Sequence, residues 1–180
     1  MEAGRALSNH DLDAHFRGNK LYGGTLAKDR LPAKGPAGKF YVINIQSQEE
    51  GDRQGTHWVG LIDCAIPDTN EDYCLYYDPF AVAPPQDVLT FMSKSKKPAV
   101  WVTDQHQPID STACGWYVIR VIEGILKSVP YEQIFDGLLK EDRYEENEAY
   151  VRKLKLKKSN SQYNHNARIS TTRQRFHGRA

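Results

Sequence analysis

The stretch that decides the fold runs from Gln107 to Leu126 and reads QPIDSTACGWYVIRVIEGIL. It begins with small and polar residues that suit a helix N-terminus. It then becomes apolar on nearly every side, with Arg120 and Glu123 as the main interruptions. Because a helix that is apolar all round leaves no face for water, the pattern predicts a buried helix around which the chain is arranged.

Cys114 falls at or just inside the first turn of this predicted helix. Free backbone N–H groups and the positive end of the helix dipole favour an anion there. The thiol should therefore ionise more easily than a free one, and the thiolate is the reactive form. The position indicates a cysteine nucleophile, but a lone cysteine is more often a small buried hydrophobic residue. This stretch by itself leaves both interpretations open.

Length and composition favour one soluble, globular domain. The chain has 180 residues, and 39% of them are hydrophobic. No apolar run approaches the length of a membrane span, and the first residues lack the basic start and apolar core of a secretory signal. We therefore expect an intracellular protein with no membrane contact. Three cysteines are an odd, small number for a secreted scaffold, which predicts reduced thiols.

The charge of the chain is unevenly distributed. The segment 151–180 holds nine Lys or Arg residues and no acidic residue: Arg152, Lys153, Lys155, Lys157, Lys158, Arg168, Arg173, Arg175 and Arg179. Subtracting nine from the 24 basic residues leaves fifteen in 1–150 against all 23 acidic ones, a net charge of −8. We expect a folded domain over 1–158 and a basic, disordered tail over 159–180. Such a tail can contact DNA by releasing counterions from phosphates, act as a nuclear-import signal, or simply be solvated.

The other segments predict an α+β protein. Strands are expected at 39–45, 56–64, 72–78 and 99–103, the first and the last of them buried. Helices are expected at 8–16, where Ser8 and Asp11 fit a capping box, and at 86–95, 131–142 and 143–158. The inward side chains of the second and third of these helices should be Val88, Leu89, Met92, Ile134, Leu138 and Leu139. The Gly- and Pro-rich segment 17–38 should be mainly loop, with a turn near Lys28–Leu31.

The two middle strands predict the position of a histidine beside an acid. Their link, residues 65–71, is short and rich in turn residues, which favours an antiparallel hairpin. In such a hairpin the start of the first strand lies beside the end of the second. His57 should then be a neighbour of Asp78, with the register uncertain by a residue or two. Cys64 and Cys74 flank this hairpin, and we expect both to be buried and unreactive.

Four residues match the roles of acyl transfer through a cysteine. Cys114 would attack the carbonyl carbon, and His57 would hold the thiol proton. Asp78 would orient the imidazole, and Gln107 would stabilise the oxyanion together with the backbone N–H of Cys114. Each residue also has an ordinary structural interpretation in a strand, turn or loop. Gln105 competes for the oxyanion role, and the competing histidines are His10, His15, His106, His165 and His177.

The motifs GTHWVGL, YYDPF and QPIDSTACGWY, in this order, resemble the adenovirus-type (adenain-like) cysteine proteases, including those of Polinton-like and adintovirus-like elements. The matching positions are His57-Trp58, Asp78-Pro79-Phe80, Gln107 and Cys114-Gly115. The resemblance covers roughly residues 7–128, and its seven-residue spacing from Gln to Cys selects Gln107 over Gln105. Asp78 stands where the adenoviral proteases have Glu, which leaves the placement within the wider clan open.

The resemblance implies a papain-like core in the arrangement shared by adenain and the ubiquitin-like-protein proteases, with the central helix packed on a small mixed sheet. It implies an endopeptidase that matures virions by cleaving capsid or core precursor proteins, often after small residues such as Gly. No cofactor is needed for the chemistry, and no Cys/His spacing suggests zinc. Adenoviral members are stimulated by DNA and by a short basic peptide. The chain would then act in the host nucleus or in the virion.

Two other functions fit the same residues. A protease of the same clan would remove ubiquitin or ubiquitin-like modifiers from host proteins. A protein of another class would be a catalytically inactive, nucleic-acid-binding virion protein that uses the basic tail. Trp58 and Trp116 neighbour the expected catalytic groups, but each is equally well explained as a core residue.

Overall fold

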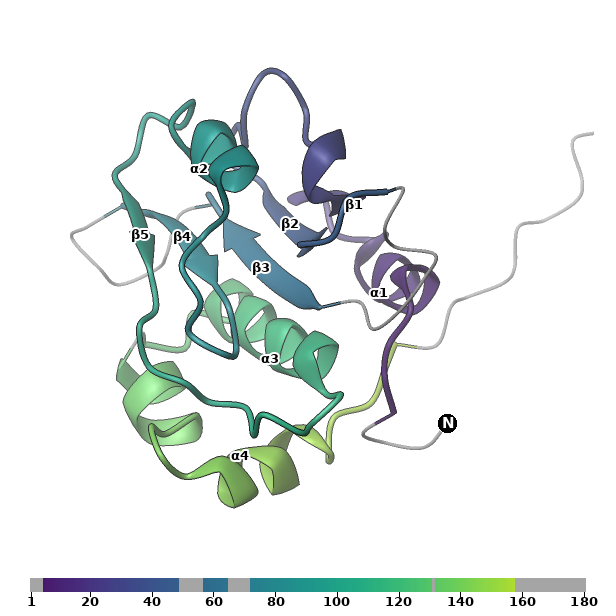
Figure 1. Ribbon diagram of the computed structural model, residues 1–180, viewed down its shortest axis with the longest axis vertical. Coiled ribbons are helices and arrows are strands. Elements are labelled where there is room, and N and C mark those ends of the chain that lie inside the picture. Colours follow the sequence, from purple (N-terminus) through teal and green to yellow (C-terminus); the bar gives the residue numbers. More distant parts are fainter. Residues whose placement is uncertain (1–4, 49–56, 65–71, 131, 158–180) are drawn as a thin grey trace, which may run out of the picture.

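A computed structural model of the chain describes residues 5–48, 57–64, 72–130 and 132–157 (Figure 1). Its centre is a five-stranded sheet whose strands lie side by side in chain order. The strands are β1 (Tyr22–Ala27), β2 (Phe40–Asn44), β3 (Trp58–Ile62), β4 (Cys74–Tyr77) and β5 (Ala99–Trp101). The two inner pairings are antiparallel and the two outer ones are parallel. The fold is therefore α+β with a small mixed sheet, as the sequence predicted.

Helices cover both faces of this sheet (Figure 1). They are α1 (Asn9–Phe16), the short 3₁₀ helix η1 (Lys28–Arg30), α2 (Gln86–Met92), α3 (Cys114–Leu126), the π-helical turn η2 (Gln133–Leu138) and α4 (Tyr144–Val151). Helices α1 and α3 pack on one face, and α2 packs on the other. The predicted capping box at the start of α1 is present, with Ser8 and Asp11 bonded to each other's backbone N–H groups.

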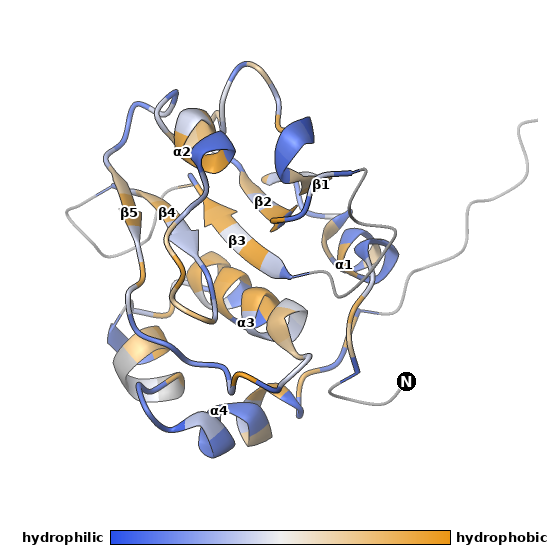
Figure 2. Cartoon of the chain, viewed as in Figure 1, coloured by the Kyte–Doolittle hydropathy of each residue, from blue (hydrophilic) through white to orange (hydrophobic). Residues whose placement is uncertain are grey.

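Helix α3 is the buried helix that the sequence predicted, and ten of its thirteen residues are buried. Figure 2 shows it as the most continuously hydrophobic helix of the chain. It lies against β3, where Gly60 faces Val118 and Ile122 and leaves room for their side chains. The two polar residues of this run, Arg120 and Glu123, lie on the outer side of the helix. Arg120 lies over the ring of Tyr150, and Glu123 pairs with His15 and Lys127.

The opposite face of the sheet has its own apolar core, which α2 covers. Val88, Phe91 and Met92 of α2 are buried there. The prediction that Leu89 points inward is wrong, because Leu89 is only half-buried and Phe91 takes that place. The spacing of the three buried residues, three and one apart, is that of a single helical stripe.

Strand β1 was missed by the sequence analysis, which expected loop over 17–38. Two adjacent glycines lower the strand propensity of this segment. The structure uses one of them for packing, because a Cβ on Gly23 would overlap the buried ring of Tyr41. The close approach of the ring to the backbone therefore requires glycine. The predicted turn near Lys28–Leu31 is present as η1.

Five further expectations need correction or fall outside the described residues. Strand β5 is not buried as expected: it forms one edge of the sheet, and Trp101 is 42% exposed. Helix α4 ends at Val151, and the residues up to 157 are not helical. Ile134 and Leu139 are buried as predicted, whereas the Leu138 side chain, the link 65–71 and the tail 159–180 lie outside the described residues.

Candidate active site

Three elements bring the predicted catalytic residues together. His57 immediately precedes β3, Asp78 immediately follows β4, and Cys114 is the first residue of α3. In the antiparallel β3–β4 pair, Gly60 lies opposite Tyr77, so the chain before β3 runs beside the chain after β4. One face of β3 packs on α3, and this contact brings the start of the helix to this end of the sheet.

His57 and Asp78 form a short hydrogen bond, with Nε2 of the ring 2.8 Å from Oδ1 of the carboxylate. Because a carboxylate only accepts, Nε2 carries the proton and Nδ1 is left for another partner. Asp78 is fully buried, and its Oδ1 also accepts the backbone N–H of Phe80 at 2.8 Å. The hairpin therefore gives the neighbour relation that the sequence predicted, and the Asp-Pro-Phe turn fixes the carboxylate.

The environment of His57 favours its charged form. Burial opposes the charge, but hydrogen bonds to Asp78 and Cys114 and the negative charge of both partners outweigh burial and raise the pKa of His57 to about 9. The ring also stacks on Phe80, with 4.8 Å between the centroids. An aromatic face attracts a cation, so Phe80 adds to the preference for imidazolium. The sequence analysis gave Phe80 no such role.

Cys114 lies at the N-terminus of α3, beside a backbone donor and the His57 ring. It begins α3, and no side chain caps this end of the helix among the described residues. The backbone N–H of Trp58 donates to its Sγ at 3.5 Å. Cys114 is 6% exposed, so the charge on its sulfur would be little screened by water. A helix N-terminus, a backbone donor and the His57 side chain thus surround the sulfur of Cys114.

The two tryptophans beside these residues anchor the N-terminal segment. The indole N–H of Trp58 donates to the carbonyl of Leu7, and that of Trp116 donates to the carbonyl of Arg5, each at 2.8 Å. Leu7 is buried, and its side chain lies against Gly115. Both tryptophans are thus core residues, and they also tie the segment before α1 to the start of α3.

Gln107 is fully buried in the loop that leads to α3. Its backbone N–H donates to the carbonyl of Pro79, so this loop is joined to the turn that holds Asp78. Its side-chain Nε2 donates one hydrogen to the carbonyl of Ser111 at 2.8 Å, which leaves the second hydrogen for another acceptor. Within the described residues, Gln107 makes no side-chain hydrogen bond to Cys114 or His57.

The competing residues occupy other places. The Gln105 side chain donates to the backbone carbonyl of Gln107. His15 bonds to Glu123 and accepts the backbone N–H of Lys157. His106 stacks between the rings of Tyr77 and Phe135. His10 is exposed on α1, whereas His165 and His177 lie outside the described residues.

The other two cysteines are set apart from Cys114 by their surroundings. Burial raises the pKa of the Cys64 thiol, and burial together with the charge of Asp63 raises that of Cys74 to about 12. Both thiols therefore stay protonated at neutral pH. Among the residues that the structure describes, no three His, Cys, Asp or Glu side chains gather as they would around a metal ion.

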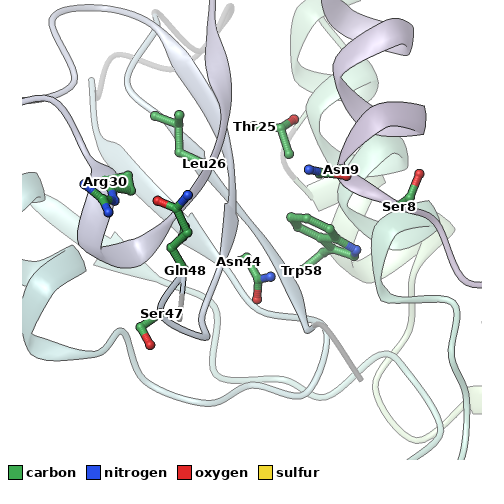
Figure 3. A pocket seen from close by; sticks show the side chains of 10 residues that line it. Ser8, Asn9, Thr25, Leu26, Arg30, Asn44, Ser47, Gln48 and Trp58 are labelled. Atoms are coloured by element: carbon green, nitrogen blue, oxygen red, sulfur yellow. The ribbon is translucent and has the colours of Figure 1, made fainter. Parts of the chain in front are cut away.

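A groove of about 520 Å³ opens beside Trp58 (Figure 3). Figure 3 shows the Trp58 ring between Asn44 and the first residues of α1. Trp58 follows His57 and its backbone N–H donates to the Cys114 sulfur, so the groove shares one residue with the surroundings of the candidate site. Ten residues line it: Ser8, Asn9, Thr25, Leu26, Ala27, Arg30, Asn44, Ser47, Gln48 and Trp58.

Comparison with known proteins agrees with this geometry at the level of the fold. The ASFV pS273R protease superimposes with a TM-score of 0.58 and 15% sequence identity, over 84% of this chain and 67% of that one. The chain has the fold of a viral cysteine protease. A selenomethionine structure of the same ASFV protease matches over 63% of this chain and 43% of its own, with 20% identity and a TM-score of 0.45. No family model and no curated protein sequence matches the chain.

The likeness concerns the papain-like arrangement of sheet and helices. It does not single out the adenovirus-type proteases, which the sequence motifs resemble. The catalytic roles of His57, Asp78, Gln107 and Cys114 stay predictions, which the geometry above makes testable. None of the helices in the described part of the chain combines the length and hydrophobicity needed to cross a membrane.

Proposed function

We propose that the protein is a cysteine endopeptidase in which Cys114, His57 and Asp78 form the catalytic triad. One observation carries the proposal: a histidine bonded at 2.8 Å to a buried carboxylate lies beside a cysteine at the N-terminus of a buried helix. Each part has a physical use in acyl transfer, and the viral cysteine protease fold makes this reaction class the natural one for the site.

The reaction would begin with attack of the Cys114 thiolate on the carbonyl carbon of the scissile peptide bond. The oxyanion that forms would accept hydrogen bonds from the backbone N–H of Cys114 and the free Nε2 hydrogen of Gln107. Imidazolium at His57 would give its proton to the leaving amine as the C–N bond breaks, leaving a thioester. Water, activated by neutral His57, would then release the acid and regenerate the thiolate.

The groove beside Trp58 would hold the substrate chain. Its side chains are mostly uncharged hydrogen-bonding groups, with Arg30 as the one cation among the ten. An extended peptide that reaches Cys114 can pass along it, with backbone groups bonded to the amide of Asn44 and the side chains of Ser8 and Asn9. Following the family resemblance, we propose precursors of viral capsid or core proteins as substrates, cut after small residues.

The test is cleavage of candidate virion precursors by the full-length protein, with Cys114→Ala and His57→Ala as variants that should fold but not cut. Full turnover by Cys114→Ala protein would overturn the proposal. A ubiquitin-like reactive probe, added in parallel, distinguishes the deconjugating alternative, since only that enzyme would consume the probe and leave the precursors intact. An inactive virion protein would do neither.

We also propose that the basic C-terminal residues bind DNA and raise the activity of the enzyme. The support is the charge of the sequence, nine cations and no acid in 151–180, together with the family resemblance. Binding that rests on phosphate contacts weakens steeply with salt. The measurement is DNA affinity from 50 to 200 mM salt for the full chain and for a chain ending at residue 158. Equal affinity for the two chains would refute a role for the tail.

A further inference from the structure

The two oxygens of Asp78 are used unequally. Oδ1 accepts from His57 and from the backbone of Phe80. Oδ2 is buried and has no hydrogen-bond partner among the described residues. A buried carboxylate oxygen without a partner is costly, so each such atom needs an explanation. The mechanism above uses only Oδ1.

Another buried group near Asp78 is also unmatched. The hydroxyl of Tyr76 has no hydrogen-bond partner among the described residues, and Tyr76 is 1% exposed. Tyr76 and Asp78 are two residues apart on β4 and its extension, and side chains so spaced leave a strand on the same face. The chain thus buries one unused donor and one unused acceptor on the same side of the sheet.

The two groups are close enough to interact. Burial is the main cause that raises the pKa of Tyr76, and the Asp78 carboxylate raises it further by its charge and as an acceptor for the hydroxyl. The hydroxyl therefore keeps its proton and can only be a donor toward the carboxylate. In this structure the two groups do not meet the distance and angle criteria of a hydrogen bond.

We propose that the Tyr76 hydroxyl donates to Oδ2 of Asp78 and is a positioning residue of the catalytic triad. With Oδ1 held by Phe80 and Oδ2 held by Tyr76, the carboxylate cannot turn about its Cβ–Cγ bond, so Oδ1 stays aimed at His57. The inference rests on the proposed function. It gives a role to Tyr76, the first residue of the YYDPF motif, which the resemblance does not place among the catalytic residues.

The test is Tyr76→Phe, which removes only the hydroxyl. A hydrogen bond to a charged group corresponds to roughly a ten- to hundredfold effect, so we expect kcat to fall about tenfold or more with KM unchanged. Tyr41→Phe is the matched control. Tyr41 is also a buried tyrosine in the core under α2, and its hydroxyl donates to the carbonyl of Pro36, away from the triad. Its kcat should stay within twofold of the wild type.

A double-mutant cycle separates positioning from general damage to the fold. In an Asp78→Ala background, Tyr76→Phe should change the rate of Cys114 alkylation by iodoacetamide less than about twofold, whereas alone it should slow alkylation about tenfold. Alkylation needs no substrate. If Tyr76→Phe behaves like Tyr41→Phe, the inference is overturned while the triad stands. The same holds if Tyr76→Phe slows alkylation of Cys114 as much in the Asp78→Ala background as it does alone. A wild-type Cys114 no more reactive than Cys64 or Cys74 overturns the proposed function and this inference with it.

Discussion

Replacing Asp78 by Asn isolates the charge that holds the His57 proton. Both donors to Asp78, the His57 ring and the Phe80 backbone, use Oδ1. An Asn that keeps its Oδ1 in the same place retains both of these hydrogen bonds and loses the negative charge, and it places an NH2 group where Oδ2 would accept from Tyr76. The change therefore tests the electrostatic part of the site while Oδ1 stays in place.

The size of the effect follows from the pKa of His57. Its pKa of about 9, against an ordinary value of 6.5, corresponds to about 3 kcal/mol of preference for the imidazolium, shared between Asp78 and Cys114. Removing the negative charge of Asp78 should lower the pKa of His57, and we expect a fall of about one pH unit. Burial still disfavours the charged imidazole in the variant.

The assay is the pH profile of kcat/KM with a fluorogenic peptide cut after a small residue. In the wild type, the imidazolium is present below pH 9 and is lost above it, so activity should fall on the alkaline side with a midpoint near 9. The stability that comes with this proton is likewise complete below pH 6.5 and is lost as the pH rises through about 9. In Asp78→Asn, the alkaline midpoint should move to about 8, so at pH 8.5 kcat/KM, relative to the plateau of each profile, should be about threefold lower than in the wild type.

Asp63→Asn is the matched control for this experiment. Asp63 is a buried carboxylate that accepts from Gly38 and Ser95 and makes no contact with the triad. Its replacement should leave the alkaline midpoint near 9. A midpoint near 9 in Asp78→Asn would refute the argument that Asp78 holds the proton on His57.

Two further predictions concern the edge strand and the oxyanion. Gly23→Ala should lower the free energy of unfolding by about 3 kcal/mol, because its Cβ would overlap the Tyr41 ring, and thermal unfolding should shift down by about 6–12 °C. Gly18→Ala, whose added Cβ meets no heavy atom within 4 Å, is the control, and an equal shift in both would contradict this packing argument. Gln107→Ala should lower kcat on the order of a hundredfold with little change in KM. Loss of turnover in Gln105→Ala instead of Gln107→Ala would reverse the oxyanion assignment.

The central helix and the hairpin could be predicted because their signals are local and strong. A run between Cys114 and Leu126 that is apolar except at Arg120 and Glu123 has one physical solution, which is burial. The strands around 56–64 and 72–78 are joined by so short a link that they pair antiparallel, and this pairing carries His57 to Asp78. These two features contain most of the candidate site.

The features that the sequence did not reveal depend on contacts between distant segments. Strand β1 pairs with β2 and places Gly23 against the Tyr41 ring, and neither residue predicts the other. The exposure of β5 follows from its place at the sheet edge, which its apolar composition does not show. Tyr76 looks like any core residue of a strand until its hydroxyl and Asp78 Oδ2 are both found buried without partners among the described residues.

Selective alkylation of the three cysteines is the most direct measurement of the central claim, that His57 keeps Cys114 as a reactive thiolate. The protein is treated at pH 6 with a limiting amount of iodoacetamide, and the label is located by peptide mass spectrometry. We expect Cys114 to react about tenfold or more faster than Cys64 and Cys74, whose raised pKa values keep them protonated, and His57→Ala to abolish this advantage. Equal labelling of the three thiols, or an advantage that survives His57→Ala, would contradict the account.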